Sequence, residues 1–190
     1  MMISIAPEDV LRIFGLTGVT YFPKSAQQRL HAGTALFLSR VGLPSNETFS
    51  PKLDLDDHAR LLSAPSLKLE IESQGGQCPP EAEDWEVLGE FQYALVAIDP
   101  SDGKIYAFPE GEDLYAPLHG DVSSLVQSLI ILEESQEHYK GLPNDDAGYQ
   151  ARIEAVERMK KRIAEYDETP LHSDSPWSSL FDEISMGMWG

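Results

Sequence analysis

The sequence is poor in cysteine, in long apolar runs and in basic residues, and each of these shortages excludes some classes of protein. It has a single cysteine, Cys78, which excludes an internal disulfide framework and any zinc site built from several cysteines. No apolar run approaches the length that crosses a membrane, and the first residues lack the basic region and apolar stretch of a secretory signal. We therefore expect a cytoplasmic protein that has no membrane partner.

Basic side chains are also scarce. Fourteen Lys and Arg face 32 Asp and Glu, which gives a net charge of −18. The imbalance lies after residue 50: residues 51–120 carry 4 basic and 15 acidic side chains, and residues 121–190 carry 6 and 14. An acidic surface repels nucleic acid and attracts basic partners, so we expect no direct binding of nucleic acid. The alternative is that the charge serves solubility alone.

Recognisable catalytic and metal-binding motifs are missing as well. There is no P-loop, no G-x-G-x-x-G and no G-x-S-x-G. The acidic run from Asp54 to His58 is spaced neither as an EF-hand loop nor as a zinc site. His119 and Asp121 have the composition of a catalytic pair, but Asp121 stands where the next helix needs an N-cap. We expect no catalytic residue, no metal and no cofactor.

Residues 85–109 predict the centre of a sheet. From Phe91 to Ile98 the side chains on both sides of an extended chain are largely apolar, which is typical of a strand covered on two faces. Residues 99–103, with Pro100 and Gly103, predict a tight turn, and the extended pattern resumes over 104–108. Residues 91–108 are therefore expected to form a hairpin in the inner part of a sheet.

Apolar spacing and capping residues predict helices around this hairpin. The expected helices are 7–14, 26–44 with Ser25 as its cap and Gly42 as its stop, 121–139, 149–166 and 178–186. Residues 45–80 are poorly patterned, although Leu67 to Ile71 alternates as a strand would. A chain of this length most simply makes one domain, 1–190, with the helices of 149–188 part of it or appended to it.

Three segments, taken in order, carry a family resemblance. They are Tyr21-Phe22-Pro23 with the helix end Phe37-Leu38-Ser39-Arg40-Val41-Gly42-Leu43-Pro44, the strand–turn–strand from Ala97-Ile98-Asp99-Pro100 to Gly103-Lys104-Ile105-Tyr106, and the helix start Leu118-His119-Gly120-Asp121-Val122-Ser123-Ser124-Leu125-Val126. The order of these segments and their residues resemble the SUKH immunity-protein superfamily, most closely its fourth group. The tail from Trp177 to Met186 resembles that group's closing Trp-containing helix, so the resemblance covers about residues 21–189.

The resemblance implies a fold and a task. The fold is α+β, with several helices packed on a central mixed or antiparallel sheet. The task is not enzymatic: such proteins bind and neutralise polymorphic toxins, often nucleases or nucleic-acid deaminases, so the partner is a cognate toxin domain, which the charge leads us to expect to be basic. The alternative is a general protein-interaction or scaffold domain of the same fold with a regulatory role.

Two acidic segments bracket the predicted hairpin and are the candidate partner-binding residues. They are Glu81, Glu83, Asp84, Trp85 and Glu86 before it, and Glu110, Glu112 and Asp113 after it. We expect the two segments to lie near each other, because they flank the same strands. Trp85 suits an aromatic anchor of an interface, although a lone Trp at the start of a strand is also typical of a core residue.

Overall fold

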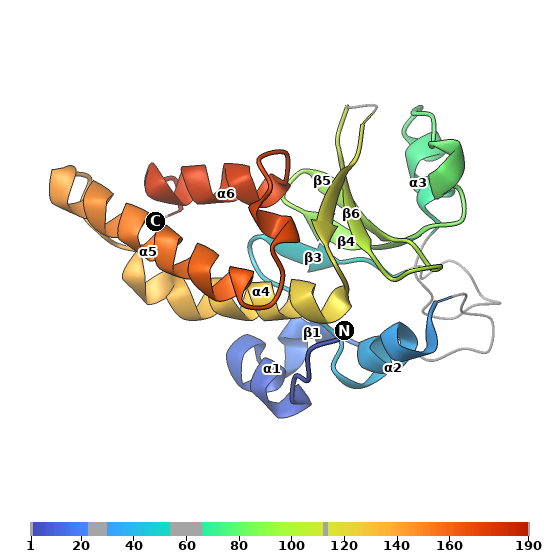
Figure 1. The fold of residues 1–190 in the computed structure, drawn as a ribbon, viewed down its shortest axis with the longest axis horizontal. Coiled ribbons are helices and arrows are strands. Elements are labelled where there is room, and N and C mark those ends of the chain that lie inside the picture. Colours follow the sequence, from blue (N-terminus) through green and yellow to red (C-terminus); the bar gives the residue numbers. More distant parts are fainter. Residues whose placement is uncertain (1, 23–29, 54–65, 112–113, 190) are drawn as a thin grey trace.

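A computed structural model describes residues 2–22, 30–53, 66–111 and 114–189 (Figure 1). Its centre is a five-stranded antiparallel sheet in the order β3-β4-β5-β6-β7. The strands are β3 (Phe49–Pro51), β4 (Glu86–Phe91), β5 (Ala94–Ile98), β6 (Ile105–Pro109) and β7 (Ala116–His119). With helices packed on this sheet, the fold is α+β, as the sequence predicted.

β5 is the middle strand, and both of its faces are covered. Val96 and Ile98 are fully buried in the large core, and Leu95 and Ala97 belong to a second cluster on the other face. The two-sided apolar pattern therefore predicted this strand correctly. The predicted start of the strand was wrong: the chain turns after β4, so Phe91 ends β4 and pairs with the first residue of β5.

One face of the sheet carries most of the helices (Figure 1). They are α1 (Pro7–Phe14), α2 (Ala32–Arg40), α4 (Val122–Ser135), α5 (Asp146–Ala164) and α6 (Pro176–Ser185). The central one is α4, which contacts β7, the N-terminal helices and α5. Short 3-10 helices η1 (Leu16–Gly18), η3 (Gln136–His138) and η4 (Thr169–Leu171) join them, and a two-stranded sheet, β1 (Val19–Thr20) with β2 (Leu43–Pro44), lies beside α4.

Local capping explains where the helices of this face begin. Asp121 caps α4: its Oδ1 accepts the backbone N–H of Ser123 at 2.9 Å and that of Ser124 at 3.0 Å, which satisfies donors that the first turn leaves open. The helices predicted over 149–166 and 178–186 exist. The first begins three residues earlier than predicted, after the cap Asp145, and the second begins two residues earlier, after the cap Ser175.

The helix predicted over 26–44 is shorter in the structure. Leu30 and His31 are not helical, and α2 starts at Ala32, where the ring Nδ1 of His31 accepts the N–H of Gly33 at 3.3 Å. The cap predicted at Ser25 lies outside the described residues. The predicted stop at Gly42 is confirmed: α2 ends at Arg40, and Gly42 has a φ of 78°, which residues other than glycine rarely adopt.

The strand predicted over Leu67 to Ile71 is wrong: these residues begin α3 (Leu67–Ser73). Leu67 is fully buried and Ile71, one turn later, is half-buried, whereas Leu69 between them is 68% exposed. The apolar residues thus follow the four-residue period of a helix, and Leu69 only imitates the alternation of a strand. With η2 (Pro80–Ala82), α3 covers the face of the sheet opposite to α4.

α5 and α6 share the large core with the sheet. Trp177 of α6 is fully buried against Phe91 of β4, with ring centres 4.9 Å apart. Arg152 of α5 is buried too, and it donates to the carbonyl oxygens of Ser185 at 3.3 Å and Pro143 at 3.2 Å. A cation at the carbonyl end of α6 is favourable. None of the described helices is long and apolar enough to cross a membrane.

Gly89 tests the pairing of the short edge strand. It lies in β4 opposite Pro51 of β3, and a Cβ there would collide with the backbone oxygen of Ser50. Backbone atoms in a sheet cannot move aside, so we expect Gly89→Ala to lower the free energy of unfolding by about 2 kcal/mol or more. Urea unfolding measures this.

Gly120→Ala is the matched control. A Cβ at Gly120 meets its nearest atom, Oδ2 of Asp167, at 3.5 Å, which is an ordinary contact. We expect it to change stability by less than about 1 kcal/mol. Equal stability of Gly89→Ala and Gly120→Ala would contradict the pairing of β3 with β4.

Candidate functional site

The face of the sheet under α3 carries an aromatic cluster. Trp85 stacks on Tyr106 with ring centres 4.4 Å apart, and Tyr115 stacks on Phe108 at 4.9 Å. Trp85 also meets Tyr115 edge-on at 5.4 Å and is only 5% exposed. Its ring is therefore a core side chain of this face, in line with the second interpretation of this residue from the sequence.

The first acidic segment lies along one end of this face. Glu81 accepts a hydrogen bond from the hydroxyl of Tyr115 at 3.0 Å, and Glu83 forms an ion pair with Lys68 of α3 at 3.1 Å. Asp84 is exposed, and Glu86 is half-buried at the start of β4. A shallow hollow of about 380 Å³ lies here and is lined by Glu81, Asp84, Trp85, Asp99, Pro100 and Ser101.

Glu110 of the second acidic segment lies at the other end of the same strands. The register shows this: Glu86 pairs with Ile98, at the end of β5, whereas Pro109, beside Glu110, pairs with Ala94, at its beginning. The structure therefore places Glu86 and Glu110 at opposite ends and does not bring them together. Glu112 and Asp113, like the run from Asp54 to His58, lie outside the described residues.

A larger groove, of about 610 Å³, opens at the end that holds Glu110. Its lining includes Tyr93, which is 83% exposed, as well as Glu90, Leu95 and Phe108. Sequence reasoning missed Glu90 and Tyr93 as candidate residues. The signal for Tyr93 is weak, because the turn that exposes it contains no Gly, Pro, Asn or Asp.

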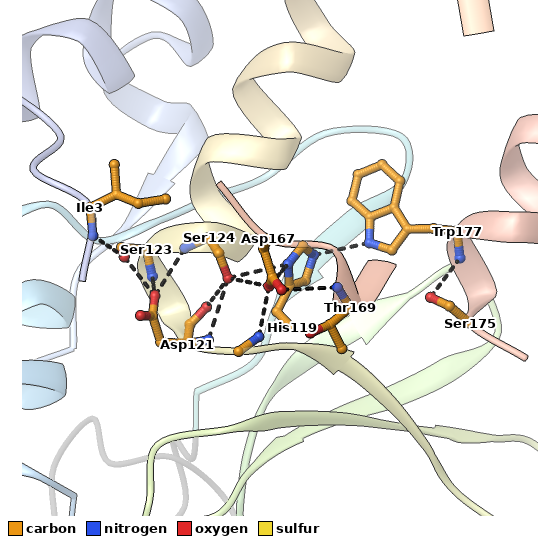
Figure 2. Close-up of polar contacts among 10 residues, drawn as sticks. Ile3, His119, Asp121, Ser123, Ser124, Asp167, Thr169, Ser175 and Trp177 are labelled. Carbon is orange, nitrogen blue, oxygen red and sulfur yellow. Dashed lines mark hydrogen bonds and ion pairs between the residues drawn. The ribbon is translucent and has the colours of Figure 1, made fainter. Parts of the chain in front are cut away.

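Figure 2 shows a second polar cluster, around His119 on the opposite face of the sheet. The indole N–H of Trp177 donates to Nε2 of His119 at 3.0 Å, so Nε2 carries no proton and Nδ1 holds the proton of the neutral ring. Nδ1 faces Oδ2 of Asp167 at 3.3 Å. Sequence reasoning considered His119 with Asp121 and rejected the pair; Asp121 caps α4 as predicted, and the carboxylate beside the ring is that of Asp167.

Ser124, His119 and Asp167 have the composition of a hydrolase triad but not its arrangement. Oγ of Ser124 lies 3.4 Å from Nδ1 of His119, the nitrogen that already holds a proton, and 2.8 Å from Oδ2 of Asp167. The other ring nitrogen, which would act as the base, accepts from Trp177. The hydrogen bonds of this cluster join α4, β7 and α6. Because His119 is only 1% exposed, a substrate cannot reach its ring.

Burial and hydrogen bonding set the ionisation of the pair. Complete burial lowers the pKa of His119 below its ordinary value, against the opposing effect of Asp167. Burial alone would raise the pKa of Asp167, but hydrogen bonds from His119, from the Gly120 N–H at 2.7 Å and from Thr169 outweigh it and hold that pKa well below its usual range. The pair is therefore a neutral imidazole beside a carboxylate.

These observations define an α+β domain. In the part of the chain that the structure describes, its His119–Asp167 cluster has a structural role. The SUKH-4 immunity protein family model matches residues 5–183, and the chain belongs to this family. Searches of curated proteins and of solved structures found no match. Membership supports a toxin-immunity role, which implies a non-catalytic protein with a cognate toxin as its partner.

Trp177→Phe tests the protonation state of His119. The unfolded chain takes up a proton on this ring near pH 6.5, whereas the folded protein resists it, so stability is lost as the pH falls below that value. The indole N–H stabilises the neutral ring, so its removal should raise the pKa of His119, while burial continues to lower that pKa. We expect the variant to be about 2 to 4 kcal/mol less stable at pH 7.5, but to lose less stability than the parent between pH 7.5 and pH 5.5.

Phe181→Leu is the control, because it opens space beside Trp177 while keeping the indole N–H in place. Urea unfolding at both pH values should give it the pH dependence of the parent. A parental pH dependence in Trp177→Phe would show that the indole adds nothing to the effect of burial on the pKa of His119.

Proposed function

We propose that this protein neutralises a toxin that acts on nucleic acid, a nuclease or a nucleic-acid deaminase, by covering a basic surface of the toxin domain in the cytoplasm. The observation that carries the proposal is the charge of −18 in a member of an immunity family. An enzyme that holds a phosphate backbone presents positive charge to it. An acidic protein can occupy such a surface and associates with it quickly.

The distribution of the charge supports the face of the sheet under α3 as the binding side. Both ends of this face carry exposed acidic side chains, Glu81 and Asp84 beside the smaller hollow and Glu110 beside the groove. We propose that these residues contact the toxin. The negative electrostatic potential of this face is strengthened by four further acidic residues, Glu83, Glu86, Glu112 and Asp113. Because Trp85 is buried, it would serve this surface by supporting the aromatic cluster beneath it.

Charge reversal at the two ends tests the proposal. We expect Asp84→Lys with Glu110→Lys to slow association with the toxin domain about tenfold at low salt, since charged groups at the edge of an interface act mainly on the association rate. The slope of the rate against ionic strength should become shallower. The measurement is stopped-flow association with an inactive form of the cognate toxin domain, together with inhibition of the active domain on DNA and RNA.

Glu154→Lys with Glu165→Lys is the matched control. Both residues are exposed on or next to α5, on the other side of the sheet, and the double reversal changes the net charge by the same amount. We expect it to leave association within about twofold of the parent. Equal slowing by both double variants would mean that only the total charge matters, and inhibition of neither nuclease nor deaminase activity would contradict the proposed toxin class.

A further inference from the structure

The groove at the turn between β4 and β5 combines an apolar floor with acidic edges. In the register of the sheet, Glu90 pairs with Leu95 and Leu95 pairs with Phe108. Directly paired residues point to the same face, so these three side chains form one row across the face under α3. Leu95 and Phe108 are only half-buried, and the end of α3 with the loop after it, from Ile71 to Pro79, forms the other wall of the groove. The floor is therefore an apolar strip beside a carboxylate.

The turn that edges this groove is held in an unfavourable conformation. Gln92 has a φ of 52°, which residues other than glycine rarely adopt. Three hydrogen bonds keep the turn in place: the Gln92 N–H donates to the carbonyl of Thr48 at 2.9 Å, its amide Nε2 to Glu183 of α6 at 3.2 Å, and the Glu110 N–H to the carbonyl of Tyr93 at 3.0 Å. A two-residue hairpin turn requires a positive φ, so the pairing of β4 with β5 imposes this conformation and fixes the position of Tyr93.

The result is a tyrosine ring presented to solvent on a fixed support. The side chain of Tyr93 is 83% exposed beside the apolar strip, with Glu90 and Glu110 both exposed on the groove lining. Within the described residues, Glu90 lies 3.8 Å from the amino group of Lys52, which makes its shorter contact, 2.8 Å, with Glu70. At the opposite end of the face, by contrast, Glu81 and Glu83 are already engaged by Tyr115 and Lys68.

We infer that this groove receives an arginine-bearing segment of the toxin domain, with Tyr93 as the aromatic anchor. The inference rests on the proposed function, which supplies a basic partner. A guanidinium group pairs with carboxylates through two parallel hydrogen bonds and stacks on aromatic rings, which matches Glu90 and Glu110 beside Tyr93 and Phe108. The aliphatic part of the arginine side chain would lie over Leu95.

Removal of the exposed ring tests the anchor. We expect Tyr93→Ala to speed dissociation of the inactive toxin domain about thirtyfold. An aromatic anchor that becomes buried in the complex acts mainly on the dissociation rate. Tyr93→Phe, which keeps the ring, should stay within about threefold of the parent. Glu90→Gln with Glu110→Gln should slow association and also speed dissociation, because it removes both the steering charge and the carboxylates that pair with the guanidinium. Surface plasmon resonance against the inactive cognate toxin domain measures both rates.

Tyr166→Ala is the matched control, since this tyrosine is 49% exposed beyond the end of α5. It should change neither rate by more than about twofold. A thermal melt of each variant detects any loss of folding, which is not expected for side chains this exposed. A photo-reactive benzoyl-phenylalanine at position 93 then identifies the occupant: it should cross-link to a toxin peptide that contains arginine.

The outcomes separate this inference from the proposed function. If the parent protein fails to bind the toxin domain, the proposed function fails. If the parent binds and Tyr93→Ala dissociates as slowly as Tyr166→Ala, the immunity role stands and the anchor is wrong. Cross-linking from position 93 to a peptide without arginine would overturn the chemistry assigned to the occupant.

Discussion

Burial of β5 on both faces is the constraint on which the rest of the structure depends. A strand with Val96 and Ile98 on one side and Leu95 and Ala97 on the other needs a cover on each face of its sheet. The two covers are unequal. The helices around α4 bury one face completely, whereas α3 and η2 cover the other face only in part. The groove beside Tyr93 lies between the end of this smaller cover and the strands beneath it.

The buried cluster around His119 shows how residues that resemble a catalytic set can serve packing alone. Each polar atom of the ring is used: Trp177 donates to one nitrogen, and Asp167 accepts from the other. A buried polar group without such a partner would destabilise the fold. The cluster thereby fixes the position of α6 relative to α4 and β7, and its burial keeps these polar groups away from solvent.

Sequence reasoning could predict what depends on local patterns. The two-sided strand, the cap at Asp121 and the stop at Gly42 each follow from a few neighbouring residues, and all three are in the structure. Five residues from Leu67 are too few to distinguish a helical period from an alternating one, so α3 was predicted as a strand. The groove and the partner of His119 depend on strand register and on residues 48 positions apart, which no local pattern contains.

The position of α6 in the chain has a consequence for the timing of folding. Trp177 fills the core between Phe91 and His119, yet it leaves the ribosome after almost all the residues that it packs against. Until then the main face of the sheet is incompletely covered, and its apolar side chains stay open to water or to chaperones. The native state therefore forms after synthesis of this helix and not during translation of the sheet. A cell that makes such a protein gains the folded form only after this helix has left the ribosome, so protection begins later than synthesis does.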